Sequence, residues 1–103
     1  MMEKTILVRY KTSEAQADAN ATLVRAVYDE LRARAPKGFR YATYRLADGA
    51  SFVHIATVAD GAANPLLELP AFKAFSAGIK DRCVEPPVAT DVTIVDSYGQ
   101  VTT

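Results

Sequence analysis

Two segments in the middle of the chain carry its strongest strand pattern. Residues 39–46 (FRYATYRL) and 51–58 (SFVHIATV) are rich in the aromatic and β-branched residues that favour β-strands. Asp48-Gly49 lies between them and is typical of a tight type I′ turn, which needs positive φ at both central residues. The pattern therefore predicts a β-hairpin with a two-residue turn.

The predicted turn also decides which hairpin residues share a face, because directly opposed residues point to the same side of a sheet. Counting outward from the turn gives the opposed pairs Arg45 and Phe52, Thr43 and His54, Tyr41 and Ala56, and Phe39 and Val58. The opposite face carries Arg40, Ala42, Tyr44, Leu46, Ser51, Val53, Ile55 and Thr57. Neither face is polar enough for a solvated surface, so we expect both faces to be covered.

A strand and a helix are predicted before the hairpin. Residues 3–10 (EKTILVRY) form an aliphatic and β-branched run that is typical of a strand. Ser13, with Gln16 three residues later, is a capping-box pattern that begins a helix of about two dozen residues. This helix should end near Ala35, because Pro36 disfavours helical backbone in the residue before it. Its apolar stripe, at three- and four-residue spacing, is Ala15, Ala19, Leu23, Ala26, Val27 and Leu31.

A second helix and a last strand are predicted after the hairpin. Asn64-Pro65 is a good N-cap and first-turn pair, and Pro70 then begins a helix that runs to about Arg82. Arg82 lies in the last turn, where a cation complements the helix dipole. Pro86-Pro87 ends regular structure there, and residues 88–98 predict the last strand.

The order strand, helix, strand, strand, helix, strand predicts an α+β fold of the ferredoxin-like kind, with an antiparallel sheet and both helices on one face. The whole chain, residues 1–103, is then one domain. The sheet face without helices still carries apolar residues, and the simplest way to cover it is a homodimer. The tail, residues 99–103, either frays or reaches a partner subunit.

Composition excludes several classes of function. The chain has 12 basic and 12 acidic residues, so it lacks the basic excess that nucleic-acid binding requires. Its N-terminal apolar run is too short for a signal peptide or a membrane span, which predicts a cytoplasmic protein that does not bind membranes. The single cysteine excludes an intramolecular disulfide, and one histidine with one cysteine cannot form a zinc site built from protein ligands alone.

Three stretches carry a family resemblance that spans residues 3–98. They are DGASFVHIATVADG, LPAFKAFSAGIKDRCVEPP and VATDVTIVDSYG, and together they resemble the dimeric α+β barrel superfamily, in particular its antibiotic-biosynthesis-monooxygenase-like branch. The resemblance implies a homodimer with a pocket between helices and sheet in each subunit, and it implies no cofactor, because some members are cofactor-independent monooxygenases of polycyclic aromatic substrates. Some other members degrade haem with an Asn, His and Trp set. This chain has no tryptophan, and its Asn20 can face the pocket only if it lies on the apolar stripe of the first helix.

His54 is the first candidate for catalysis, since histidine alone has an unperturbed side-chain pKa near neutrality. As a base it could take a phenolic proton from an aromatic substrate, and the resulting electron-rich anion could pass an electron to dioxygen. The predicted register gives it a substrate-binding group on the same face, namely Tyr41, Thr43, Arg45 and Phe52. In that group Arg45 would hold the oxyanion and Tyr41 would orient the ring. The alternative is that His54 is a satisfied strand residue, hydrogen-bonded to Thr43 or Tyr41.

Other aromatic and sulfur-containing residues are better explained by packing. Tyr44 lies on the face opposite His54 and fits a core or interface role. Leu69, Phe72 and Phe75 have the spacing that any amphipathic helix needs, and Cys83 ends a helix rather than beginning one, so nothing lowers its thiol pKa. Two functions remain open. The first is a small oxygenase or isomerase acting on an aromatic or polyketide-like molecule. The second is a non-catalytic dimeric small-ligand-binding or stress-related module, in which the same pocket holds an apolar ligand.

Overall fold

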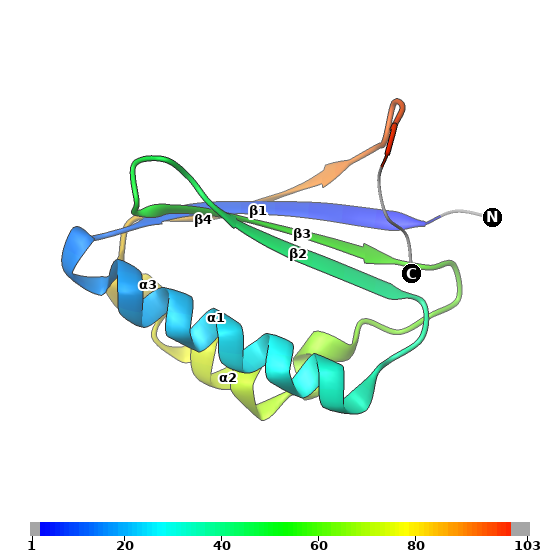
Figure 1. The fold of residues 1–103 in the computed structure, drawn as a ribbon, viewed down its shortest axis with the longest axis horizontal. Helices are drawn as coiled ribbons and strands as arrows, with labels where there is room; N and C mark the ends of the chain where they lie inside the picture. The colour runs from blue at the N-terminus through cyan, green and yellow to red at the C-terminus, as the bar shows by residue number, and fades with distance from the viewer. Residues whose placement is uncertain (1–2, 100–103) are drawn as a thin grey trace.

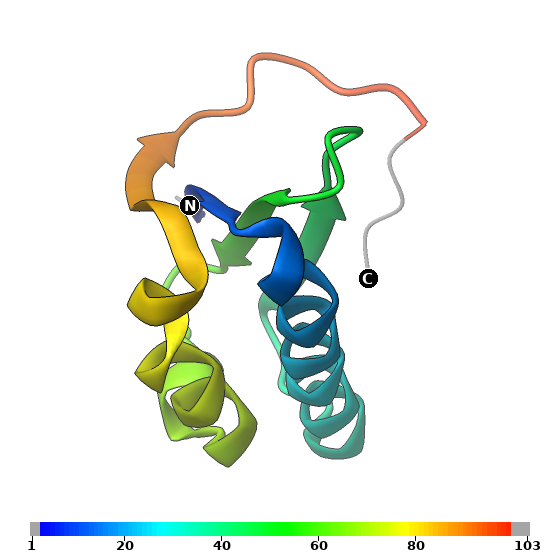
Figure 2. The ribbon, with the colours of Figure 1, turned by 90° about the vertical axis from the view of Figure 1, so that its left-hand side faces the viewer.

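The computed structural model describes residues 3–99, and the predicted tail beyond Gly99 lies outside them. Its elements, in chain order, are β1 (Lys4–Thr12), α1 (Glu14–Arg34), β2 (Phe39–Arg45), β3 (Ser51–Val58), the 3₁₀ helix η1 (Pro65–Glu68), α2 (Pro70–Ala77), α3 (Ile79–Arg82) and β4 (Cys83–Val92). The strands form one antiparallel sheet in the order β2-β3-β1-β4. All helices lie on one side of this sheet (Figures 1 and 2). The fold is the predicted ferredoxin-like α+β arrangement.

The hairpin has the predicted register but a different turn. Phe39 opposes Val58, Thr43 opposes His54, and Arg45 opposes Phe52. Of the two turn residues only Gly49 has a positive φ, at 76°, so the type I′ prediction is wrong. The Asp48 carboxylate instead accepts hydrogen bonds from the backbone N–H groups of Ala50 and Ser51 and from the Ser51 hydroxyl. These bonds stabilise a wider loop that preserves the same strand pairing.

The first helix begins and ends where the sequence predicts. Ser13 is its N-cap, although the Ser13 side chain makes no capping hydrogen bond, so the predicted capping box does not form. Ala35 ends the helix in the left-handed conformation and donates its N–H to the Leu31 carbonyl, one residue before Pro36. Among residues 3–99, this helix and the others lack the length and apolar character needed to cross a membrane.

The buried stripe of α1 differs from the predicted one. It consists of Ala17, Asn20, Val24 and Val27. Ala15, Ala19 and Ala26 are exposed. The predicted stripe leaves Asn20 out, but buried partners satisfy its amide, so the condition for Asn20 to face inward is met.

The predicted second helix is broken at Gly78 into α2 and α3. A Cβ atom at Gly78 would lie 2.9 Å from the Arg82 guanidinium, so glycine leaves the space that this side chain occupies. Arg82 lies in the last turn of α3, as predicted, but its side chain is only 8% exposed. The break lets the chain turn Arg82 inward.

The last strand begins earlier than predicted. β4 starts at Cys83, directly after α3, and it contains Pro86 and Pro87. Prolines are tolerated here because β4 is an edge strand, so one side of its backbone has no hydrogen-bonding partner in the sheet. Residues 93–99 are not part of the strand.

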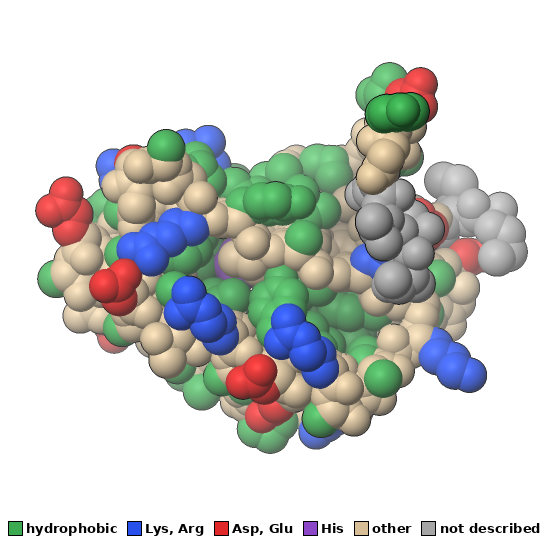
Figure 3. Space-filling model, viewed as in Figure 1, with side chains coloured by type: hydrophobic (Ala, Val, Ile, Leu, Met, Phe, Trp, Pro, Cys, Tyr) green, Lys and Arg blue, Asp and Glu red, His purple; other side chains and the backbone are tan. Residues whose placement is uncertain are grey.

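The two sheet faces differ in how they are covered. The core packs between the helices and the sheet around Tyr10, Val24, Val27, Phe52, Leu66, Leu69 and Phe75. The other face, which we call the open face, has no helix, and it presents Tyr44 at 58% exposure and Val88 at 65%. Hydrophobic side chains gather along this upper side of the molecule in Figure 3. The segment after β4 adds Ile94, Val95 and Tyr98 as exposed apolar residues.

The Asp48 loop gives the first prediction. Hydrogen bonds from Ser51 and Ala50 lower the pKa of Asp48 to about 2. A carboxyl group with a lowered native pKa stabilises the fold fully above its unfolded pKa of about 4, and this contribution disappears as the pH falls towards 2. We therefore expect Asp48→Ala to lower the thermal midpoint at pH 7 and to shrink the difference between wild type and variant at pH 2. Asp60→Ala, which removes an exposed loop carboxylate, is the control and should leave the midpoint nearly unchanged at both pH values.

Candidate functional site

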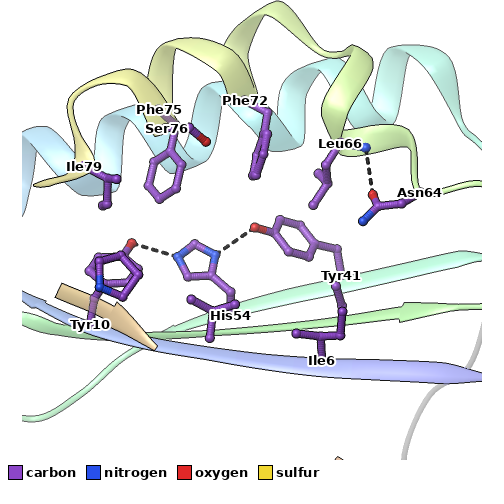
Figure 4. A pocket seen from close by; sticks show the side chains of 13 residues that line it. Ile6, Tyr10, Tyr41, His54, Asn64, Leu66, Phe72, Phe75, Ser76 and Ile79 are labelled. Atoms are coloured by element: carbon purple, nitrogen blue, oxygen red, sulfur yellow. Dashed lines mark hydrogen bonds between the residues drawn. The ribbon is translucent and has the colours of Figure 1, made fainter. Parts of the chain in front are cut away.

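A cavity of about 290 Å³ lies between the helix-facing side of the sheet and the segment η1–α2–α3. Its walls are almost wholly apolar, with Phe72, Phe75 and Ile79 from the helices facing the sheet (Figure 4). The sheet contributes alternate residues of its strands because side chains of a strand alternate between faces. These are Ile6, Val8 and Tyr10 from β1, Tyr41 from β2, and His54 and Ala56 from β3. The volume is close to the lower end for small-ligand pockets, which suits a compact ring system.

His54 lies in the floor of this cavity between two tyrosines (Figure 4). Its Nε2 is 2.7 Å from the Tyr10 hydroxyl, and its Nδ1 is 2.8 Å from the Tyr41 hydroxyl. Thr43 Oγ1 also lies 3.0 Å from Nδ1. The histidine is 5% exposed, so both ring nitrogens are satisfied inside the protein.

A second group of polar side chains continues from Tyr10 away from the cavity. The Asn20 amide nitrogen donates to the Tyr10 hydroxyl oxygen at 2.8 Å. The Arg82 Nε donates to the Asn20 side-chain oxygen at 3.0 Å, and another Arg82 nitrogen donates to the Phe75 carbonyl at 2.8 Å. Asn20 is fully buried, and among residues 3–99 no carboxylate forms an ion pair with Arg82. One buried cation therefore anchors a continuous set of hydrogen bonds to His54.

This arrangement sets the tautomer of His54. A guanidinium can only donate, so Asn20 must turn its oxygen to Arg82 and its NH₂ group to Tyr10. Tyr10 thus accepts from Asn20, and its own hydroxyl hydrogen is left for His54 Nε2. With Nε2 accepting, the proton of the neutral imidazole resides on Nδ1.

Burial keeps the ionisable groups of the floor neutral at pH 7. It lowers the pKa of His54 to about 4 and raises that of Tyr10 to about 12. Burial, reinforced by the neighbouring Tyr28 and Tyr10 hydroxyls, also raises the pKa of Tyr41. At pH 7 the His54 imidazole and the two tyrosine hydroxyls of the floor are therefore uncharged hydrogen-bonding groups.

The predicted site residues divide between two hollows. Tyr41 and His54 line the cavity under α2, whereas Thr43, Arg45 and Phe52 line a hollow beside α1. Arg45 is fixed there by an ion pair with Asp18 at 3.0 Å. The division arises because α1 and the α2 segment cover different parts of the same sheet face. Thr43 connects the two through its hydrogen bond to His54, and Phe52 connects them by stacking on Tyr10.

Three residues that lead by hydrogen bonds to His54 are absent from the predicted site: Tyr10, Asn20 and Arg82. Tyr10 lies in the predicted first strand, and nothing in the sequence connects it to His54. Arg82 had one usable signal in the sequence, since Gly78 lies one helical turn before it and makes space for a long side chain. Phe72 and Phe75 were interpreted as core residues, and Phe75 is both a core residue and part of the cavity wall.

No protein-family model and no curated protein sequence matches the chain. Solved structures do match its fold. Rv0793 from Mycobacterium tuberculosis is 19% identical, with a TM-score of 0.69 over 95% of this chain and 100% of that chain. A candidate antibiotic biosynthesis monooxygenase from Nitrosomonas europaea is 15% identical, with a TM-score of 0.71 over 94% of both chains.

A mutant of SnoaB, a cofactor-independent oxygenase from Streptomyces nogalater, is 18% identical, with a TM-score of 0.61 over 95% of this chain and 98% of that chain. At this level of identity the match concerns the fold, which is the one that the sequence resemblance implied. The chain therefore has the ferredoxin-like fold of antibiotic-biosynthesis-monooxygenase-like structures.

The lowered pKa of His54 gives the second prediction. Burial lowers it from the ordinary 6.5 to about 4, so the folded state resists a proton that the unfolded state accepts. The histidine then stabilises the fold fully above pH 6.5, and about 3 kcal/mol of unfolding free energy is lost as the pH falls from 6.5 to 4. Denaturant unfolding at pH 7 and pH 4.5 measures this loss, and His54→Gln should remove most of it.

Because His54 is the single histidine, its imidazole NMR signals are unambiguous. We expect the Nδ1–H tautomer from pH 8 down to about pH 5. An imidazole that titrates near pH 6.5 would contradict the burial argument.

Proposed function

We propose that this protein binds an aromatic or polyketide-like small molecule in the cavity above His54 and oxidises it with dioxygen, without a cofactor. The observation that carries the proposal is the contrast within this cavity: apolar walls of suitable size and one hydrogen-bonded polar group, Tyr10–His54–Tyr41, at the floor. Apolar walls hold a ring, and a few placed polar groups fix its orientation. The fold shared with a cofactor-independent oxygenase supports the same reading.

In the proposed reaction the substrate supplies the electrons. A ring methylene group next to ionisable oxygens loses two hydrogens, one oxygen atom of O₂ becomes the new carbonyl oxygen, and the other leaves as water. Ionisation of the substrate makes it electron-rich enough to react, and a donor at the developing oxyanion stabilises that state. Tyr41 is the floor residue that can donate there, and His54 supports Tyr41 from behind.

A second function is favoured by one specific observation. Both nitrogens of His54 are occupied and its pKa is lowered to about 4, which makes it a weak base at pH 7. The same cavity could then hold an apolar ligand without turning it over. This is the non-catalytic binding module, and the oxygen-uptake experiment below separates it from the oxygenase.

We also propose that the protein is a homodimer joined through the open face. The support is the set of exposed apolar residues there, since a monomeric protein rarely leaves a large contiguous apolar patch in water. Val53 continues the patch beside Tyr44, and Ile55 and Leu7 continue it in the next row, while Arg9 lies between Val53 and Val88. A second copy offers the same patch, as a twofold interface requires.

The oxygenase proposal predicts dioxygen consumption with polyhydroxylated aromatic substrates that carry a ring methylene group. Removing one hydrogen-bond donor from a developing oxyanion costs about a hundredfold in rate, so we expect a loss of that size in Tyr41→Phe. His54→Ala should show a comparable loss. Tyr44→Phe, the same change on the same strand but on the open face, is the matched control and should match wild type. Wild-type protein that consumes no oxygen with any substrate of the panel, yet binds them, would support the binding module instead.

The dimer is tested by light scattering. We expect a native mass twice that of the chain, and a monomer for Tyr44→Glu, because a carboxylate buried opposite Val53 without a partner is costly in an interface. Tyr44 is 58% exposed in the single chain, so the variant should still fold. Ala74→Glu introduces the same charge on the exposed side of α2 and should stay dimeric. A monomeric wild-type protein would refute the interface.

A further inference from the structure

The hydrogen bonds in the cavity floor run in a single direction. Arg82 donates to Asn20, Asn20 donates to Tyr10, and Tyr10 donates to His54 Nε2. The direction is imposed by Arg82, which has no acceptor atom, and it is kept by burial, because a reversed hydroxyl on Tyr10 would have no acceptor inside the protein. His54 therefore presents a protonated Nδ1 towards Tyr41.

The Tyr41 hydroxyl has one hydrogen to donate and one oxygen that can accept a hydrogen bond. A protonated Nδ1 has no free lone pair, so the Tyr41 hydroxyl can accept from His54 but cannot donate to it. Within residues 3–99, the close hydrogen bond of the Tyr41 hydroxyl is to His54, and the neighbouring Thr43 Oγ1 is itself engaged with Nδ1 and with the Tyr28 hydroxyl. Tyr41 lines the cavity, so an acceptor atom that enters the cavity competes with Thr43 for its hydroxyl hydrogen.

We infer that the cavity selects aromatic molecules that place an acceptor oxygen, a ketone carbonyl or an ionised phenol, against the Tyr41 hydroxyl. The inference rests on the proposed function only in taking this cavity as the binding site, and it adds the chemical class of the ligand. Arg82 and Asn20 become positioning residues, which act on the ligand through Tyr10, His54 and Tyr41. Neither touches the ligand.

Two physical effects make this selection effective. Hydrogen bonds aligned head to tail polarise one another, so a hydroxyl at the end of such a row is a stronger donor than an isolated one. A ligand without an acceptor leaves the Tyr41 hydrogen unpaired against apolar walls, which costs the desolvation of that group. Ring size alone therefore does not decide binding.

A matched pair of ligands tests the selection. 1-Tetralone and tetralin have the same bicyclic frame and differ in one carbonyl oxygen. We expect 1-tetralone to bind about fivefold tighter than tetralin, the effect of one net hydrogen bond. Its carbonyl stretching band should move to lower frequency on binding. Tyr41→Phe should bind both ligands equally and leave the band at its position in an apolar solvent.

Asn20→Asp tests the direction with almost no change of shape. A carboxylate accepts from both Arg82 and Tyr10, so Tyr10 would turn its hydrogen to the carboxylate and accept from His54 Nε2 instead. Nδ1 then accepts from Tyr41, whose hydrogen is no longer available to the ligand. We expect the carbonyl band to lose its shift and the imidazole NMR signals to change to the Nε2–H tautomer, while the circular dichroism spectrum is retained.

Two more variants serve as controls. Gln16→Glu makes the same amide-to-carboxylate change on the exposed side of α1, away from the cavity, and it should keep the band shift. Arg82→Lys retains a buried donor and should keep the Nδ1–H tautomer and part of the shift, whereas Arg82→Met should lose it.

The outcomes separate the two proposals. If both ligands bind wild-type protein equally and the carbonyl band does not move, the inference is wrong and the cavity remains a binding site. If neither ligand binds, the cavity is not the binding site, and the proposed function fails together with the inference. A band shift that survives Asn20→Asp would refute the directional argument.

Discussion

The burial of one guanidinium is the constraint on which much of this structure depends. Arg82 has no carboxylate partner among the described residues, so its charge is stabilised by hydrogen bonds to Asn20 and to the Phe75 carbonyl and by the face of the Phe75 ring, 5.3 Å away. To reach them, the second helix breaks at Gly78. The same contacts bury Asn20, rotate the buried stripe of α1 and order the hydrogen bonds that end at His54.

The two faces of the sheet carry different features. Its helix-covered face carries the cavity and the polar floor, and its open face carries the apolar patch. Strand alternation makes this possible, because neighbouring residues such as Thr43 and Tyr44 point to opposite sides. A substitution can therefore alter one face without the other, which is why Tyr44→Phe is a fair control for Tyr41→Phe.

The fold by itself does not specify the chemistry. Structures with this fold include a cofactor-independent oxygenase from Streptomyces nogalater and Rv0793, and the identities of 18% and 19% leave the cavity residues free to differ. The ligand that this protein selects therefore depends on the atoms in its own cavity. A histidine whose lone pair is already engaged acts best by orienting a neighbouring donor, and here that donor is Tyr41.

The sequence by itself determined the order of the elements, the register of the hairpin and the ends of α1, because local chemistry controls them: Asp48-Gly49 keeps the loop short, and Pro36 stops a helix. It also brought His54 and Tyr41 to one face. Only the tertiary structure assigned Thr43, Arg45 and Phe52 to another hollow, because the placement of helices over a sheet is not encoded in strand alternation. The inward position of Arg82 is likewise visible only in the tertiary structure. A buried charge depends on its partners, and the partner Asn20 lies far from Arg82 in the chain.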